Sequence, residues 1–81
     1  MTVEKTILDY LEDANPTLLG HAAEPAKLKM RRVLDSIGML SFLMFLEQTF
    51  GIRIRDQDVV AENFDTVSTT ISYIEKRVDK T

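Results

Sequence analysis

The sequence predicts an all-α fold: a four-helix bundle with three main helices, one short third helix and a long loop between helices 1 and 2. Two observations favour this fold. Apolar residues recur at spacings of three and four in three separate segments, which is the period of an amphipathic helix. No segment demands a sheet, and 81 residues suffice for a single domain, 1–81. Since the chain has no cysteine and no evident metal site, helix packing must supply its stability.

The first helix is predicted over residues 2–14 from one stripe of apolar side chains. The stripe consists of Val3, Ile7, Tyr10, Leu11 and Ala14. Asn15-Pro16 is expected to end this helix, because proline disfavours helical geometry in the residue before it. Residues 15–34 are then predicted to form an irregular loop that is pinned to the core at a few leucines, with a turn of helix near 26–31.

Three further helices are predicted after this loop. The second main helix runs over 36–50, and Gly51 follows it where a left-handed C-terminal cap is expected. Asp56 is expected to cap a brief helix through residue 61. Asp65 or Thr66 then caps the last helix. The apolar stripe of this last helix is Val67, Ile71, Ile74 and Val78.

Helix 36–50 is apolar on two faces when it is drawn at about 100° per residue. The broad face, expected to contact the core, holds Met39, Phe42, Leu43, Leu46 and Phe50. The second face holds Ile37, Leu40 and Met44, and Phe45 lies apart from both. One interpretation is that the bundle buries both faces. The other is that the second face is exposed for partner docking, as exposed apolar patches often are.

Charge and hydropathy exclude several classes of function. A net charge of −3 argues against nucleic acid as the main partner. No apolar run reaches the ~18 residues that a membrane span needs, and the N-terminus lacks a signal-peptide pattern. We therefore expect a monomeric cytoplasmic protein without a membrane span.

Ser36 follows Asp35 at the start of this apolar helix, and three roles are open to it. Either residue could be a helix N-cap. Ser36 as a catalytic nucleophile lacks support, because the only histidine, His21, is a single loop residue with no sign of pairing. A phosphate ester on Ser36 would instead lie at the positive end of the helix dipole, beside Ile37, Leu40 and Met44.

Asp35-Ser36-Ile37, followed by Met44, Leu46-Glu47, Phe50-Gly51-Ile52 and Ile54, resembles the acyl carrier protein family. The resemblance covers essentially the whole chain and implies that family's four-helix fold. It implies that Ser36 carries 4′-phosphopantetheine, installed from coenzyme A by a phosphopantetheinyl transferase, and that Asp35 assists recognition by this transferase. Ile37, Leu40, Met44 and Glu47 are the implied partner-binding residues. The protein itself would do no chemistry.

The chain departs from carriers of fatty acid synthesis at two places. Arg31-Arg32-Val33-Leu34 replaces the usual residues before the Asp-Ser pair, and Glu47 is the only acid of helix 36–50. Lys27, Lys29, Arg31 and Arg32 form a basic cluster, which is either a solvated loop or part of a less negative docking face.

The pattern Leu34-Asp35-Ser36-Ile37-Gly38 is similar to discrete carriers such as the D-alanyl carrier proteins, which receive an amino acid from an adenylating ligase. It favours a specialised acyl or aminoacyl pathway, with ligases, synthases or transferases as partners. Two alternatives remain. One is a helical protein-interaction domain in which Ser36 is only a cap. The other is a small hydrolase that uses Ser36.

Overall fold

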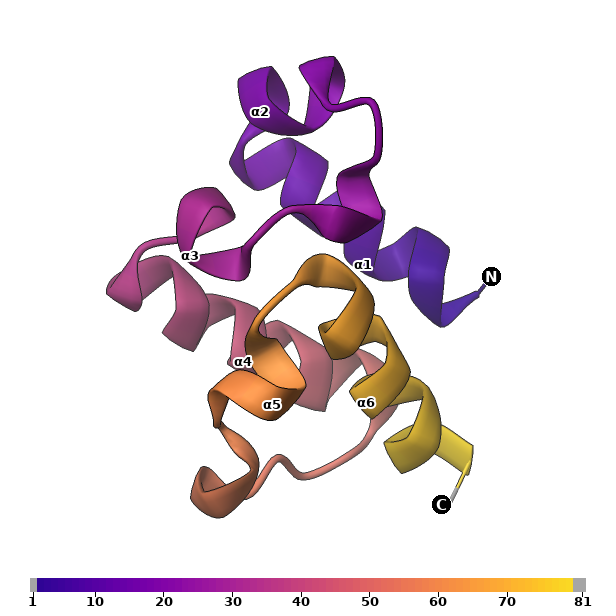
Figure 1. Cartoon of the computed structure of the whole chain (residues 1–81). Helices are drawn as coiled ribbons and strands as arrows, with labels where there is room; N and C mark the ends of the chain where they lie inside the picture. Colours follow the sequence, from indigo (N-terminus) through magenta and orange to yellow (C-terminus); the bar gives the residue numbers. More distant parts are fainter. Residues whose placement is uncertain (1, 80–81) are drawn as a thin grey trace.

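A computed structural model describes residues 2–79, and every regular element among them is helical (Figure 1). The all-α fold predicted from the sequence is confirmed. The three long helices are α1 (Val3–Ala14), α4 (Ser36–Phe50) and α6 (Val67–Asp79). The short elements are α2 (Pro16–His21), η1 (Pro25–Lys27), α3 (Met30–Val33), η2 (Asp56–Asp58) and α5 (Ala61–Phe64).

Helix α1 begins at Val3, one residue after its predicted start, because Thr2 is its N-cap. Thr2 has extended backbone geometry, and its Oγ1 accepts a hydrogen bond from the Lys5 N–H at 3.0 Å. Ile7 and Leu11 of the predicted stripe are fully buried, and Val3 and Tyr10 pack against the core in part. Ala14, the last predicted member of the stripe, is exposed at the end of the helix.

The segment between α1 and α4 is more regular than predicted. Asn15 ends α1 and also caps α2, since its Oδ1 accepts a hydrogen bond from the Leu18 N–H at 3.2 Å. Pro16 occupies the first turn of α2, where its missing N–H costs nothing. Asn15-Pro16 was predicted only to end the first helix. The same pair also begins α2. Two further short helices, η1 and α3, replace the turn predicted near 26–31.

Helix α4 has the predicted bounds, and its end is set by Gly51. This glycine adopts a left-handed conformation with φ 64°, and its N–H bonds to the Glu47 carbonyl. Phe42 and Leu46 of the predicted core face are fully buried. Phe45 was predicted to lie apart from both apolar faces of the helix. It stacks on Tyr10 of α1, with ring centroids 4.4 Å apart. It therefore joins α4 to α1.

The brief helix predicted from Asp56 through residue 61 is wrong in position. Residues 56–58 form a single 3-10 turn, η2, and α5 begins only at Ala61. Between them Val60 is extended, with φ −129° and ψ 162°, so the helix cannot continue through it. The Asp58 carboxylate accepts a hydrogen bond from the Tyr73 hydroxyl at 2.9 Å, which ties this turn to α6 instead.

Helix α6 starts after Thr66, one of the two caps predicted. The Thr66 Oγ1 accepts a hydrogen bond from the Thr69 N–H at 3.1 Å. Three of its four predicted stripe residues, Val67, Ile71 and Ile74, are buried. They meet α1 and α4 in one hydrophobic core. Its buried members are Ile7, Leu11, Leu19, Met30, Val33, Leu34, Phe42, Leu46, Ile52, Val67, Ile71 and Ile74.

The start of α6 also holds the segment that leads into α4. The Met30 N–H donates to the Asp65 carbonyl at 2.9 Å, and the Val67 N–H donates to the Leu28 carbonyl at 3.0 Å. The Lys29 Nζ lies 2.8 Å from a carboxylate oxygen of Asp65. These bonds hold residues 28–30 in place, a few residues ahead of Asp35 and Ser36.

Candidate functional site

Asp35 is the N-cap of α4. Its Oδ1 accepts a hydrogen bond of 2.6 Å from the Gly38 N–H, and its backbone is extended. A Cβ at position 38 would lie 3.1 Å from this same oxygen, so glycine admits the carboxylate at close range. The sequence left open whether Asp35 or Ser36 caps the helix, and the geometry assigns the cap to Asp35.

Ser36 therefore does not cap the helix. It is the first residue of α4 and is exposed. Within residues 2–79 its hydroxyl has no hydrogen-bond partner. The hydroxyl thus stands at the surface, at the positive end of a helix dipole, where a negative group is favoured.

A hollow of about 370 Å³ opens beside Ser36. Its wall is mostly apolar, and its polar members are Arg31, Asp35 and Ser36. The residues that line it are Met30, Arg31, Leu34, Asp35, Ser36, Met39 and Phe64. Four different parts of the chain meet here: α3, the cap of α4, α4 itself and α5. The hollow is an adjoining surface on which a group attached to Ser36 could rest.

The second apolar face of α4 is exposed. The exposed fractions are 77% for Ile37, 65% for Leu40 and 59% for Met44. We call these three residues the α4 stripe. They are unusually open for large apolar side chains in so small a protein, which is typical of an interaction surface.

Glu47 is engaged within the protein. Its Oε2 accepts a hydrogen bond of 2.8 Å from the Ile54 N–H, so the carboxylate fastens the segment after α4 to the helix. The side chain is half-buried. As the only acid of α4, it leaves this helix with little free negative charge.

Val59 and Val60 are two further exposed apolar residues, outside α4, which were not predicted from the sequence. They are 39% and 44% exposed, between η2 and α5. Val59 shares a second hollow of about 370 Å³ with Leu40 and Met44. Their adjacent, β-branched side chains in an irregular segment were the available signal, but only the fold brings Val59 beside Leu40 and Met44 of the α4 stripe.

The basic cluster divides into paired and unpaired members. Lys27 pairs with Glu24 at 3.0 Å, and Lys29 pairs with Asp65 at 2.8 Å. Arg31 and Arg32 are exposed, and neither side chain has an ion pair or hydrogen bond within the described residues. Two free guanidinium groups therefore lie close before Ser36 in the chain.

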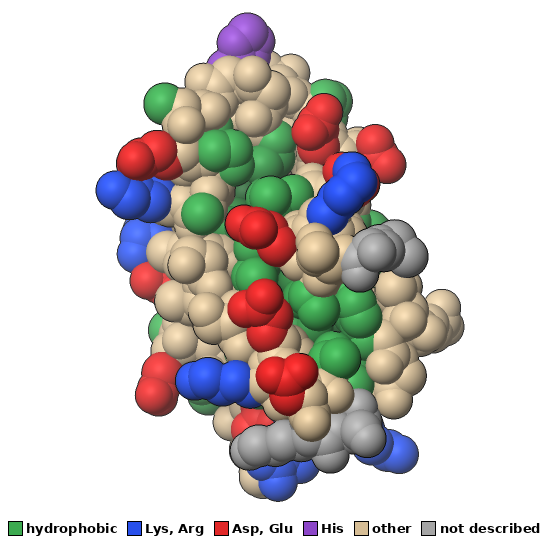
Figure 2. All heavy atoms as spheres, turned by 90° about the vertical axis from the view of Figure 1, so that its right-hand side faces the viewer, with side chains coloured by type: hydrophobic (Ala, Val, Ile, Leu, Met, Phe, Trp, Pro, Cys, Tyr) green, Lys and Arg blue, Asp and Glu red, His purple; other side chains and the backbone are tan. Residues whose placement is uncertain are grey.

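Several acidic side chains lie on α1, away in the chain from the basic residues that precede Ser36. Helix α1 carries Glu4, Asp9, Glu12 and Asp13. Figure 2 shows the side of the molecule that bears both chain ends, with acidic side chains down its middle and hydrophobic ones between them. The charge of the molecule is thus uneven, with free arginines in the segment before Ser36 and many acids on α1.

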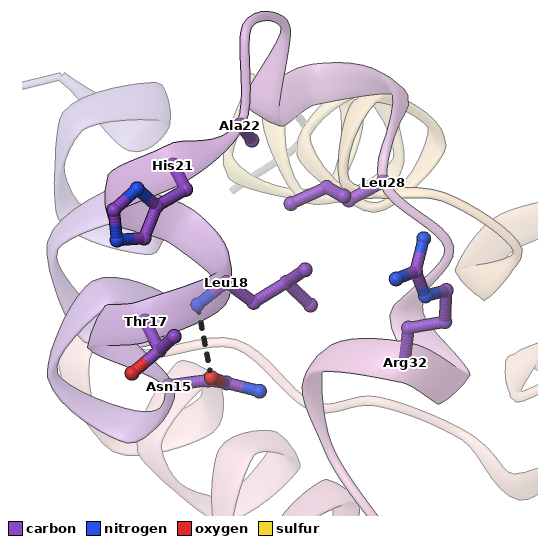
Figure 3. Close-up of a pocket in the computed structure, with 7 residues that line it drawn as sticks. All are labelled: Asn15, Thr17, Leu18, His21, Ala22, Leu28 and Arg32. Atoms are coloured by element: carbon purple, nitrogen blue, oxygen red, sulfur yellow. Dashed lines mark hydrogen bonds between the residues drawn. The ribbon is translucent and has the colours of Figure 1, made fainter.

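His21 lies in another hollow, of about 560 Å³, between α2 and the η1–α3 segment (Figure 3). The Leu18 and Leu28 side chains point into this hollow, together with Arg32, while the imidazole lies at its edge. Ser36 does not line it. The arrangement therefore gives no support to a Ser36–His21 nucleophile and base pair.

The chain is similar to a curated D-alanyl carrier protein of Abiotrophia defectiva. The two are 28% identical over 76 residues, which cover 94% of this chain and 96% of that protein. No family model matches the chain, and no solved structure matches it. This similarity supports an acyl or peptidyl carrier protein family, in agreement with the resemblance seen in the sequence. None of the helices in residues 2–79 has the length and apolar content to cross a membrane.

Proposed function

We propose, on the premise that this chain belongs with the acyl and peptidyl carrier proteins, that Ser36 is the attachment site of a 4′-phosphopantetheine arm. The arm, when attached, supplies a thiol that holds an acyl or aminoacyl group as a thioester. The protein would present this group to partner enzymes at high effective concentration. The observation that carries the proposal is the exposed, unbonded Ser36 hydroxyl directly after the Asp35 cap of α4.

The residues around Ser36 fit such an arm. The hydroxyl is exposed, so a transferase can reach it, and it serves no capping role that modification would remove. The adjoining hollow offers Met30, Leu34, Met39 and Phe64 to the apolar parts of a flexible chain. Asp35 is proposed to assist transferase recognition through the part of its carboxylate that the Gly38 N–H leaves free.

For the cargo, we propose an amino acid or another short acyl group of a specialised pathway. The similarity to a D-alanyl carrier protein favours an aminoacyl group loaded by an adenylating ligase. Loading of the modified protein with D-alanine by such a ligase, detected as a second mass gain, tests this choice.

Partner enzymes are proposed to dock on the α4 stripe, with Glu47 at its end. The stripe is exposed and apolar, while Glu47 is held by Ile54 and leaves α4 with little free negative charge. With Arg31 unpaired in the hollow beside Ser36, at the start of α4, this docking face is proposed to be less negative than that of carriers of fatty acid synthesis. Charge complementarity then favours partners other than those with strongly basic surfaces.

Measurement of intact mass after incubation with coenzyme A and a promiscuous phosphopantetheinyl transferase tests the attachment site. We expect the mass to rise by one phosphopantetheine, and we expect no rise in Ser36→Ala. Ser41→Ala, which removes an exposed hydroxyl one and a half turns further along α4, is the matched control and should be modified normally. Folded protein that gains no mass with several transferases would contradict the proposal. A helical interaction domain that uses the α4 stripe alone would then be favoured.

A further inference from the structure

Arg31 differs from the other basic residues that precede Ser36. Lys27 and Lys29 are paired with acids, and Arg32 lines the hollow beside α2. Arg31 alone among these four lines the hollow that Ser36 also lines. Its side chain is exposed and makes no ion pair or hydrogen bond in the described part of the chain, so it is free to bind a ligand.

A phosphodiester on Ser36 would bring a second negative charge to this place. Asp35 already lines the hollow, and its Oδ1 lies 2.6 Å from the Gly38 nitrogen. Like charges at short range repel each other, and an adjacent cation offsets this repulsion. Arg31 is the only cationic residue among the seven that line this hollow.

The chemistry of arginine suits this ligand. The guanidinium group presents several N–H donors in a planar fork, which matches the two free oxygens of a phosphodiester. A covalent bond to Ser36 keeps the phosphate beside the hollow, so the pair forms at high effective concentration. Since Arg31 is exposed, the pair is expected to weaken with salt.

We propose that the Arg31 guanidinium binds the phosphate of the arm attached to Ser36 and holds the base of the arm over the adjoining hollow. This inference rests on the proposed function. It makes Arg31 a positioning residue, which fixes the direction in which the arm leaves the protein.

Arg32 provides a matched control. It is the next residue, it carries the same side chain, and it is also exposed and unpaired in the described part of the chain. Figure 3 shows its guanidinium beside Leu28 and across from Leu18, in the hollow that Ser36 does not line. Arg32→Gln therefore removes the same charge from the same segment without touching the proposed contact.

The test compares the unmodified and modified protein by NMR after intact mass has established how much arm is attached. In 15N-labelled protein we expect the Arg31 Nε–Hε signal to shift on modification and to return toward its unmodified position in high salt. The Arg32 signal should stay in place. The 31P signal of the arm should narrow in Arg31→Gln, because the phosphate gains mobility, and should be unchanged in Arg32→Gln.

The outcomes separate this inference from the proposed function. If the mass rises but the Arg31 signal does not move, or if both glutamine variants leave the 31P signal unchanged, the inference is overturned while the carrier function stands. It is also overturned if the Arg32 signal and variant respond as strongly as those of Arg31, since a diffuse field would then be the cause. A folded protein that gains no mass overturns the carrier function itself.

Discussion

At the scale of single residues, Asp35, Ser36 and Gly38 have different roles at the start of α4. Asp35 caps the helix, and Gly38 supplies the N–H and the space that the cap needs. Glycine in a helix costs about 1 kcal/mol relative to alanine. The cap that it admits returns a similar amount, typically about 1 kcal/mol. Ser36 is left with an exposed hydroxyl that the fold does not use.

Two substitutions of Asp35 separate its capping role from its proposed role in recognition. Asp35→Ala should lower the free energy of unfolding by about 1 kcal/mol, because the Gly38 N–H loses its acceptor. Asp35→Asn keeps an acceptor oxygen and should stay within about 0.5 kcal/mol of the parent. Urea unfolding followed by circular dichroism measures both.

The Asp35→Asn variant then tests recognition in a folded protein. If the transferase depends on the carboxylate charge, modification of this variant should slow markedly while its stability is retained. Modification of Asp35→Asn at the parent rate would limit Asp35 to capping.

At the scale of elements, α4 combines a core face with an exposed one. Leu46 and Phe42 are fully buried, whereas Ile37, Leu40 and Met44 are more than half exposed. The predicted division of this helix into two faces is thus confirmed for these residues, although the docking of partners stays a prediction. A helix with one buried face gives a small bundle its core and still offers an apolar surface.

Substitutions on the α4 stripe test its use. Leu40→Glu and Met44→Glu should change the free energy of unfolding by no more than about 0.5 kcal/mol, because both side chains are mostly exposed. Each should slow modification and loading by partner enzymes, since a charge would be buried in an apolar contact. Thr49→Glu adds the same charge at an exposed position on a different face of α4 and is the control. Unfolding of either stripe variant would mean that this face belongs to the core.

The sequence predicts α1, α4 and α6 well because each carries a long apolar period and a capping residue. Residues 15–34 were predicted less well for a physical reason. Their short helices are too brief for a periodic pattern, and they are held by distant partners, such as Leu28 with Val67 and Lys29 with Asp65. The same reason applies to the hollow beside Ser36, which brings Arg31 and Phe64 together from α3 and α5. Ser36 could be identified as a candidate site from the sequence because its motif consists of residues that are adjacent in the chain.

At the scale of the whole molecule, α6 is bonded to both long connections, the one between α1 and α4 and the one between α4 and α6. The segment before α4 is bonded to Asp65 and Val67, and η2 is bonded to Tyr73. The Asp58 carboxylate also lies 3.4 Å from the Arg55 Nε. The hydrogen bond from Tyr73 holds the pKa of Asp58 below its ordinary value. Burial, and then the hydrogen bond to Asp58, raise the pKa of Tyr73 from 10.0 to about 12.

These shifts predict how stability depends on pH. The folded state favours neutral Tyr73, so this contribution is complete below pH 10 and is lost as the pH rises toward about 12. The folded state favours charged Asp58, so that contribution is present above the ordinary carboxyl pKa and is lost as the pH falls through the lowered pKa of Asp58. Tyr73→Phe removes both effects of the hydrogen bond. Its melting temperature should therefore lie below that of the parent near neutral pH, and the difference should shrink toward both extremes.

Thermal melts of the two proteins by circular dichroism across the pH range measure this difference, in which the titration of all other groups cancels. Absorbance of the phenolate gives an independent check, since the parent should show one tyrosine that ionises only near pH 12 and Tyr73→Phe should lack it. A constant difference in melting temperature across alkaline pH would contradict the raised pKa of Tyr73, to which burial and then the hydrogen bond to Asp58 contribute. The contribution of Tyr73 would then be packing against Phe64, whose ring centroid lies 5.4 Å away, and that contact does not depend on pH.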